Sequence, residues 1–250
     1  MRFACALFAL CVVGLLEARH RARVRPTGVL RVTALDVGQG DALVVELPDG
    51  AAMLVDAGGA LTGGPDPGEH VVVPWLALRR RSELAAAVLS HPHPDHGGGL
   101  PAVLGAVRVR ELWDTGQGAS LGYAGFYADT LAAARRRGVR VRGPSSLCGA
   151  PWRFHGVTVE VLSPCPAARD ETPPNDASFV LRLTWGRASV LLPGDLERDG
   201  EAALLSSVGP VSVLKVGHHG SRTSTTDAWL DALRPRVALV SCGHPSPFSH

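Results

Sequence analysis

The sequence predicts an α+β fold with four layers, in which two sheets pack together and helices cover their outer faces. Short apolar segments of strand length recur from residue 29 to residue 240, and turn residues separate them. Segments of helical character lie between these strands in both halves of the chain. Because the apolar strands must be buried, layers in the order helix, sheet, sheet, helix are the arrangement that we expect.

The composition is that of a globular chain. Of the 250 residues, 46% are hydrophobic and 19% are charged, which fits one large domain or two small ones. Residues 1–31 contain six arginines and one glutamate, so the rest of the chain has an acidic excess and lacks the basic surface of an avid nucleic-acid binder. The five cysteines form no Cys-x-x-Cys pair, which predicts neither a zinc ribbon nor a disulfide framework; a Cys148–Cys165 bridge stays open.

The N-terminal segment, residues 1–27, is predicted to be separate from a domain over residues 28–250. Residues 3–16 are apolar and uncharged, and a basic stretch follows them. This length is below the roughly 20 residues of a membrane span, so the segment suits a signal peptide or the remnant of a membrane anchor. The two interpretations place the domain on opposite sides of a membrane. We expect a membrane-associated or exported protein.

The first half of the domain is predicted to start with antiparallel strands, because Pro48–Gly50 is a hairpin signal between two of them. Strands are expected over residues 29–35, 42–47, 52–55, 85–89 and 107–113. Helices are expected over residues 71–83, 100–104 and 123–137.

The second half repeats the alternation of strands and helices around a proline-rich loop at residues 163–175. Strands are expected over residues 139–141, 157–162, 178–184, 188–192, 211–216 and 237–240. Helices are expected over residues 199–205 and 226–233.

The stretch His91-Pro-His-Pro-Asp-His96 places four metal-ligand side chains directly after an apolar strand. A residue before proline is pushed toward extended geometry, so His91 and His93 should point the same way. We expect them to converge with Asp95, while His96 turns aside. Imidazole and carboxylate are ligands that zinc, manganese and iron share. The loop holds more ligands than one tetrahedral ion takes from a single loop, which predicts a two-metal site.

Three later stretches place polar residues at strand ends. Asp195 follows a buried strand and a glycine, where it is placed either to bridge two cations or to cap a helix. His218 and His219 follow another strand, and adjacent extended residues point in opposite directions. We therefore expect one of the two histidines to face the metals and the other to orient a ligand or touch substrate. The third stretch, at the C-terminus, contains His244 and His250.

The polar residues around His218 and His219 are candidates for contacts with a substrate phosphate. Lys215 can serve as a point charge, and the hydroxyl of Ser221 can meet a phosphate oxygen. For Thr225 and Thr226, capping of the following helix is the preferred interpretation. Asn175 is the weakest candidate, because Asn-Asp commonly forms a turn.

Five stretches together resemble, in order, the metallo-β-lactamase-like domain of the ComEC/Rec2 family of DNA-uptake proteins. They are Leu35–Asp41, Leu54–Gly58, Ser90–Gly98, Pro193–Glu197 and Leu214–Ser221. The resemblance covers about residues 29–250. It implies an αββα metallo-β-lactamase fold, a centre of two divalent metal ions (zinc or manganese) and hydrolysis of DNA phosphodiesters, in a protein whose other part is a membrane channel.

The resemblance also implies roles for residues of this chain. The resemblance implies that Asp41 lies behind the metal ligands or beside the substrate. The implied ligand or active-site positions are His91, His93, Asp95, His96, Asp195 and His218 or His219. The chain departs from the family in lacking the channel helices, and it stops near a Gly-His-Pro element after which the family usually continues. A domain truncated at its C-terminus, or a stand-alone relative, is therefore expected.

The leading functional hypothesis is a metal-dependent nuclease that hydrolyses single-stranded DNA in competence, associated with a membrane channel. Its catalytic candidates are Asp95, Asp41 and Lys215, and its substrate-binding candidates are Ser221, Asn175 and His250. One alternative is a lactamase-like hydrolase of a small ester, lactone or phosphodiester. The other is a non-catalytic, truncated binding module.

Overall fold

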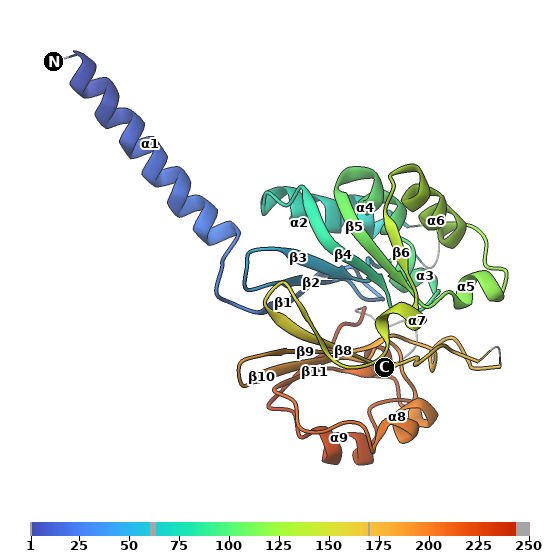
Figure 1. Ribbon diagram of the computed structural model, residues 1–250. Coiled ribbons are helices and arrows are strands. Elements are labelled where there is room, and N and C mark those ends of the chain that lie inside the picture. Colours follow the sequence, from blue (N-terminus) through green and yellow to red (C-terminus); the bar gives the residue numbers. More distant parts are fainter. Residues whose placement is uncertain (1, 61–63, 170, 244–250) are drawn as a thin grey trace.

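The computed structural model describes residues 2–60, 64–169 and 171–243, which form two six-stranded mixed sheets packed face to face (Figure 1). Helices cover the outer face of each sheet, so the predicted four-layer arrangement is confirmed. The first sheet is built by residues 31–142 and the second by residues 152–239.

The first sheet has the strand order β1-β2-β3-β4-β5-β6. β1, β2 and β3 pair antiparallel as predicted, and β3 to β6 are parallel. The strands are β1 (Arg31–Ala34), β2 (Leu43–Glu46), β3 (Ala52–Val55), β4 (Glu83–Leu89), β5 (Arg108–Asp114) and β6 (Arg140–Arg142). The helices of this half are η1 (Gly68–Val72), α2 (Val73–Leu78), α3 (Pro94–Gly97), α4 (Leu100–Ala106), α5 (Gln117–Ser120) and α6 (Phe126–Arg136).

The second sheet has the order β12-β11-β10-β9-β8-β7. Strands β7 to β10 are antiparallel, whereas β10, β11 and β12 are parallel. The strands are β7 (Trp152–Phe154), β8 (Val157–Ser163), β9 (Val180–Trp185), β10 (Ala188–Leu192), β11 (Val213–Lys215) and β12 (Val237–Leu239). The helices are α7 (Pro144–Leu147), α8 (Arg198–Leu204), η2 (Gly217–Gly220) and α9 (Asp227–Leu233).

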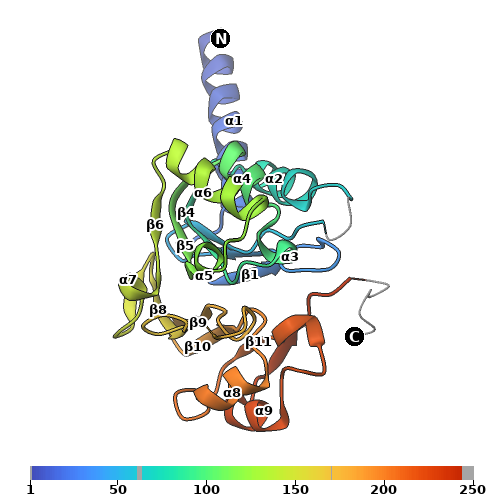
Figure 2. The same cartoon turned by 90° about the vertical axis from the view of Figure 1, so that its right-hand side faces the viewer.

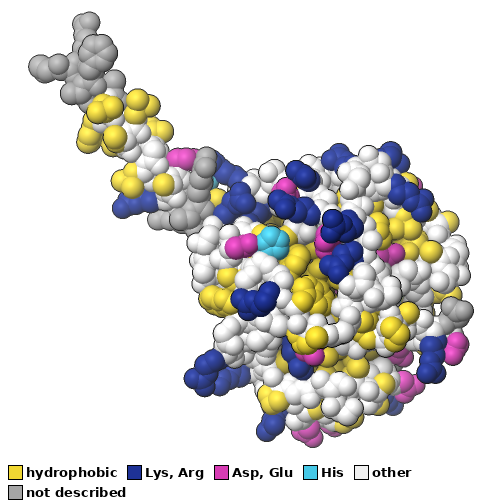
Figure 3. Space-filling view, in the orientation of Figure 1, with side chains coloured by type: hydrophobic (Ala, Val, Ile, Leu, Met, Phe, Trp, Pro, Cys, Tyr) yellow, Lys and Arg dark blue, Asp and Glu magenta, His cyan; other side chains and the backbone are white. Residues whose placement is uncertain are grey.

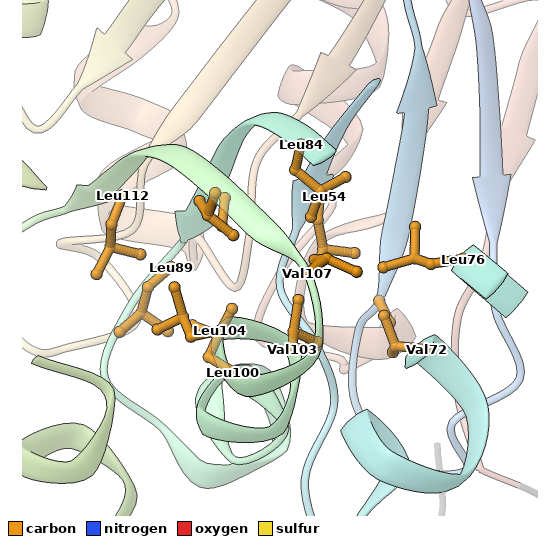
Figure 4. Packing of buried hydrophobic residues seen from close by; sticks show 14 of the residues in the cluster. Leu54, Val72, Leu76, Leu84, Leu89, Leu100, Val103, Leu104, Val107 and Leu112 are labelled. Carbon is orange, nitrogen blue, oxygen red and sulfur yellow. The ribbon is translucent and has the colours of Figure 1, made fainter. Parts of the chain in front are cut away.

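The apolar core has separate inner and outer layers because successive strand residues point to opposite faces of a sheet. On β2, Leu43 and Val45 are buried between the two sheets, whereas Val44 is buried under the outer helices. Figure 4 shows the outer layer, where Leu100 and Val103 of α4 lie against side chains of the first sheet. Both faces of the central strands are therefore covered, which explains their nearly continuous apolar sequence.

The helix expected over residues 71–83 ends early, at Leu78. The helix ends in a turn in which Arg80 is left-handed (φ 52°) and Arg81 N donates to the carbonyl of Leu76 at 2.8 Å. The buried side chain of Arg81 then donates to Glu46 at 2.6 Å, and β4 begins at Glu83. The short helices α3, α5 and α7 and the strand β7 were also not predicted.

The N-terminal segment forms one helix, α1 (Arg2–Val24), which projects from the domain on the side away from α3 (Figure 1). Leu7, Phe8 and Leu10 are each at least two thirds exposed. Glu17 forms an ion pair with Arg80 of the domain. Of the helices in the described part of the chain, none is both long enough and apolar enough to cross a membrane.

A disulfide joins Cys148 to Cys165, which corrects the expectation of a chain without a disulfide framework and settles the pairing that had stayed open. The two Cα atoms lie 5.6 Å apart, within the range of disulfides. The bond ties the end of α7 to the start of the proline-rich loop. Spatial closeness at the sheet edge decides this pairing, and cysteine spacing alone does not reveal it.

Basic side chains gather on the face of the first sheet and its helices in Figure 3. On the strands of this sheet, Arg108 and Arg110 pair with Glu83, and Arg140 and Arg142 pair with Glu111. These carboxylates offset part of the positive charge of the strands.

Candidate metal centre

The predicted metal ligands lie where parallel strands of both sheets end. β4 leads into the ligand loop at His91, β10 leads to Asp195, and β11 leads to His218 and His219. Carboxyl ends of parallel strands share one edge of a sheet, and here the edges of the two sheets adjoin. Figure 2 views the domain from the side on which α3 and α5 lie. Segments more than 100 residues apart therefore meet in one centre.

Two glycine-containing turns hold the ligand loop in place. Asp41 N donates to the carbonyl of Asp95 at 3.2 Å, and Ala57 N donates to that of His96 at 2.7 Å. A Cβ atom at Gly40, where φ is +123°, would lie 2.1 Å from the carbonyl oxygen of Asp95. One at Gly59 would lie 1.8 Å from the carbonyl oxygen of Pro94. The approach of these turns to the loop therefore requires glycine.

The ligand loop follows the prediction at His93, whereas His91 lies at a bend in which its carbonyl accepts a hydrogen bond from His93 N at 3.0 Å. His93 is extended, and His91 Nε2 lies 3.0 Å from His93 Nδ1. Pro94 then starts the helical turn α3, which returns His96 to the interior. The expectation that His96 turns aside is wrong: its ring is fully buried between Asp56 and Asp195.

Asp195 is the residue that the imidazoles of the centre surround. Its Oδ2 atom lies within 4 Å of the Nε2 atoms of four imidazoles that come from two different loops. The distances are 3.1 Å to His96, 3.4 Å to His219, and 3.8 Å to both His91 and His218. Asp195 is not a helix cap, because α8 starts after Glu197. One carboxylate oxygen facing imidazoles on two sides is the arrangement that a bridging ligand needs.

Both histidines of the second loop approach Asp195, contrary to the expectation that only one faces the centre. His218 and His219 are not extended; their φ angles are 47° and 55°, in the left-handed region. That backbone costs free energy for a residue other than glycine, and residues held in it cluster at functional sites. His219 Nδ1 lies 3.0 Å from the carbonyl oxygen of Ser241, which leaves Nε2 facing Asp195.

The charges of the centre are strongly coupled. Burial lowers the pKa of His91 well below its usual value, which favours the neutral form of the imidazole. Burial also disfavours charge on His96, but Asp195 and Asp56 outweigh it and raise the pKa of His96 well above the usual value. For His219, burial is likewise outweighed by hydrogen bonds to Asp195, Asp41 and Asp95, and its pKa is raised to about 10. The carboxylates therefore attract positive charge to the centre.

The residues fit a divalent metal. His96 Nε2 and His219 Nε2 face each other at 3.1 Å, and Asp195 Oδ1 is buried with no hydrogen-bond partner among the described residues. Lone pairs at such distances repel unless a proton or a cation lies with them. The described residues also include a buried group of four whose ligand atoms lie within 4.8 Å of one another: Asp41, His96, Asp195 and His219. Nitrogen and carboxylate donors suit zinc, manganese and iron.

Asp41 and Lys215 lie in the interior, behind the predicted metal ligands. Lys215 forms an ion pair with Asp41, and both side chains are 1% exposed. Asp41 faces the Nδ1 atoms of His96 and His219, at 4.0 and 3.5 Å, whereas Asp195 faces their Nε2 atoms. The geometry contradicts a Lys215–phosphate contact, because the ammonium group is enclosed by carboxylates.

Two residues of the site were missed from the sequence. Asp56 accepts hydrogen bonds from the backbone N–H and the hydroxyl of Ser90, both at 2.7 Å. It lies at the carboxyl end of an apolar strand, as Asp195 does, and that pattern was the available signal. Glu197 Oε1 lies 2.9 Å from His218 Nδ1 and accepts a hydrogen bond from Thr223 at 2.9 Å.

The predicted substrate-binding side chains of Ser221 and Asn175 contact other side chains of the protein. The Ser221 hydroxyl lies 3.0 Å from that of Thr223, inside its own turn. Asn175 donates to Glu197 at 3.3 Å. Thr226 caps α9 by accepting from Trp229 N, so its predicted capping role is confirmed. His244 and His250 lie outside the described residues.

Comparison with known proteins gives three relatives that match most of this chain. It is 32% identical over 237 residues to ComE operon protein 3 of Bacillus subtilis, covering 88% of this chain and 29% of that protein. It is 33% identical to Recombination protein 2 of Haemophilus influenzae, covering 87% of this chain and 25% of that protein. It is 31% identical to Competence protein ComA of Neisseria gonorrhoeae, covering 92% of this chain and 30% of that protein. The chain therefore spans less than a third of the length of these relatives.

The family model of the metallo-beta-lactamase superfamily matches residues 35–244. The match includes the ligand loop, Asp195 and the paired histidines, which are the segments that the fold brings together. The chain therefore belongs to the metallo-beta-lactamase superfamily.

Proposed function

We propose that this domain is a metal-dependent phosphodiesterase that hydrolyses DNA, with single-stranded DNA as substrate. The observation that carries the proposal is the position of Asp195 Oδ2 within 4 Å of four imidazole Nε2 atoms from two loops. A bridging carboxylate between two groups of nitrogen ligands is typical of hydrolytic two-metal sites.

The ligands divide into two groups around Asp195. His91, His93 and His218 would hold one cation, and Asp95, His96 and His219 would hold the other. Two divalent cations, zinc or manganese, would lower the pKa of a bound water and offset the charge of a phosphate. Asp195 belongs to both groups, and its loss would therefore disturb both.

The protein residues then supply position and proton transfer. Asp95 is the more accessible carboxylate, with a side chain 14% exposed against 3% for Asp195. It is placed to orient the attacking water and to accept its proton. His218, with a side chain 24% exposed and its Nδ1 beside Glu197, is placed to face the phosphate from the solvent side.

The assignment of DNA as substrate depends on the relatives. Two of them carry names that refer to competence and recombination. We infer that this chain acts on DNA during uptake, together with a membrane channel part, because it matches about a quarter to three tenths of each relative. This association also supports a membrane-associated location.

Chelation followed by metal add-back tests the proposal. Cleavage of a labelled single-stranded oligonucleotide should stop with chelator and return with zinc or manganese. His93→Ala should abolish cleavage, whereas His155→Asn, at the Asp49 surface site, should leave it unchanged. Cleavage that persists in metal-free protein would refute the proposal, and fewer than one bound ion per chain would favour a non-catalytic module.

A lactamase-like hydrolase of a small ester, lactone or phosphodiester remains the second candidate. The acidic excess after residue 31 and the paired surface arginines favour a small substrate over a long polyanion. A salt titration separates the two, because DNA binding weakens steeply with ionic strength whereas turnover of a small neutral substrate does not.

A further inference from the structure

The helix α1 exposes apolar side chains on all sides. Six of its large apolar side chains are more than half exposed: Leu7, Phe8, Leu10, Val13, Leu15 and Leu16. At about 100° per residue, these positions are distributed around the whole helix axis and do not form one stripe. A protein partner covers one stripe of a helix, whereas a helix that is apolar on every side belongs inside a core or a membrane. The interior of a lipid bilayer is therefore the environment that this segment matches.

The helix changes from apolar to basic where it approaches the domain. Arg19 and Arg25 follow the apolar segment, both are exposed, and no ion pair joins them to a described residue. Figure 3 shows hydrophobic side chains along α1 and basic side chains where it meets the domain. Arginines at the end of an apolar segment lie at the headgroup level of a bilayer, where anionic lipids attract them.

The C-terminal end of α2 lies beside the root of α1, because Arg80 forms an ion pair with Glu17. Leu78 is 73% exposed, the largest exposure among the large hydrophobic side chains of the described residues. Arg79 lies over the Trp75 ring, with its Cζ atom 5.1 Å from the ring centroid. Leucine, tryptophan and arginine side by side are typical of a surface that enters the interface of a bilayer.

The arginines of the two helices form one patch. Burial lowers the pKa of Arg81, and the positive charges of Arg25 and Arg79 lower it further, against the effect of Glu46. Both arginines therefore lie close to Arg81. Arg25 also lines a cavity of about 450 Å³ together with Glu83, which places it at the amino end of β4.

We propose that this end of the domain docks on a bilayer that contains anionic phospholipids. The docking face consists of Leu78, Arg79 and Arg80 of the domain with Arg19 and Arg25 at the root of α1. Residues 7–16, about 15 Å of helix, enter the acyl layer, and the arginines pair with lipid phosphates. An apolar insertion and a basic patch are the two signals that stable association with a membrane requires. The inference deepens the proposed membrane-associated location and does not depend on the reaction at the metal centre.

Docking in this way directs the metal centre away from the bilayer. β4 begins at Glu83, beside the docking face, and ends at Leu89, from which the chain leads to His91. A strand of seven residues is about 20 Å long. In Figure 1, α1 likewise projects on the side away from α3, which follows the ligand loop. The ligand loop therefore faces the aqueous phase, where a soluble substrate can reach it.

Flotation of the full chain with vesicles tests the docking face. Vesicles of phosphatidylcholine alone are compared with vesicles of phosphatidylcholine and phosphatidylglycerol. The chain should partition more strongly to the anionic vesicles, and salt should reduce the difference. Arg79→Gln should weaken binding to the anionic vesicles about fivefold, as expected for one arginine near an anionic surface, and leave binding to phosphatidylcholine unchanged. Arg222→Gln, an exposed position at the carboxyl end of β11, is the matched control and should change neither.

The apolar part of the docking face has its own pair of variants. Leu78→Gln should weaken binding to both kinds of vesicle about tenfold, because a leucine no longer leaves water. Leu121→Gln, at a side chain that is 46% exposed beyond the carboxyl end of β5, should bind as the unmodified chain does. Urea unfolding without vesicles checks that the two variants are equally stable.

Two free cysteines report the orientation of the docked chain. Cys11 is exposed on α1, and the exposed Cys242 follows Ser241, whose carbonyl oxygen lies 3.0 Å from His219 Nδ1. Cys5→Ser combined with Cys242→Ser leaves Cys11 as the one thiol outside the disulfide, and Cys5→Ser combined with Cys11→Ser leaves Cys242. Anionic vesicles should protect Cys11 from a charged maleimide and leave the labelling rate of Cys242 unchanged. Protection of Cys242 would contradict the orientation.

Three further results would overturn the docking face. One is that the unmodified chain binds neither kind of vesicle. Another is that Arg79→Gln and Leu78→Gln bind vesicles as well as the unmodified chain does, which would show that α1 inserts without the domain. The third is that Arg79→Gln loses binding of single-stranded DNA and keeps its binding to vesicles, which would assign the patch to nucleic acid. Vesicle binding by a chain that cleaves no DNA would support the docking face and refute only the nuclease.

Discussion

Asp56 and His96 are 40 residues apart in the sequence, yet Asp56 Oδ2 lies 2.8 Å from His96 Nδ1. The other ring nitrogen of His96 faces Asp195 at 3.1 Å, so the imidazole is held at both nitrogens. Asp56 is itself fixed by the N–H of Ser90. Carboxylates that hold the distal nitrogen of an imidazole set its tautomer and orientation for metal binding.

Asp56→Asn should therefore weaken metal binding without removing a ligand. The amide cannot accept from Ser90 and His96 as the carboxylate does, and such losses lower metal affinity about 10- to 100-fold. Competition with a chromophoric chelator measures the change. Asp36→Asn, in the exposed part of the neighbouring turn, is the matched control, and equal affinities for the two variants would contradict the role of Asp56.

Lys215 and Asp41 form a buried ion pair, so removal of one partner should destabilise the fold. Lys215→Met leaves Asp41 buried without its cation, which costs about 3–5 kcal/mol in comparable cases. The double variant Lys215→Met with Asp41→Asn should recover most of this loss. Urea unfolding of metal-free protein measures the free energy of unfolding and keeps metal binding out of the comparison.

An exposed ion pair on the first sheet serves as the comparison for the buried pair of Lys215 and Asp41. Arg110 pairs with Glu83 and is 57% exposed, so Arg110→Met should change the free energy of unfolding by at most about 1 kcal/mol. If Lys215→Met unfolds at the same urea concentration as Arg110→Met, the buried pair does not stabilise the fold.

The fold was largely predictable because the length and apolar character of the strands are local properties of the sequence. The predictions of secondary structure and of the disulfide were wrong where a residue distant in the sequence determines the local structure. The helix expected over 71–83 ends at Leu78, and the residues that follow bring the side chain of Arg81 to Glu46 of β2, a contact that the local sequence does not contain. The disulfide pairs cysteines that only the packing of α7 beside the end of β8 brings together.

The ligand loop was predictable for a similar reason. The prolines after His91 and His93 constrain the local backbone, and His93 is extended as expected. The position of His96 depends on the helical turn from Pro94, and the role of Asp56 depends on the parallel pairing of β3 with β4. The pairing of two strands about 30 residues apart depends on the whole sheet, so a short sequence motif does not predict it.

The disulfide should contribute to stability by restricting the unfolded chain. Its cysteines are 17 residues apart, and a loop of this size corresponds to about 3 kcal/mol in the chain-entropy model. Replacing both Cys148 and Cys165 by serine should lower the melting temperature and make it insensitive to reductant. Cys242→Ser, at an exposed free cysteine, should leave both properties unchanged. A melting temperature of the unmodified chain that reductant does not alter would contradict this contribution.

Asp114 should make stability depend on pH. Burial raises the pKa of Asp114 above its ordinary value of 3.8, while a hydrogen bond from Tyr127 at 2.7 Å works in the opposite direction. A carboxyl whose pKa is raised by folding contributes stability that is present below 3.8 and is lost as the pH rises through the folded-state pKa. Asp114→Asn cannot ionise and avoids that loss.

The measurement is the free energy of unfolding of Asp114→Asn minus that of the unmodified chain, from pH 3 to pH 8. The difference should rise in favour of the variant from about pH 4 and level off once Asp114 is ionised. Any constant cost of burying the amide shifts the whole curve and leaves its shape. In a Tyr127→Phe background the rise should extend to higher pH, because the hydrogen bond that favours the ionised carboxylate is absent. A difference that does not vary with pH would show that folding leaves the ionisation of Asp114 unchanged.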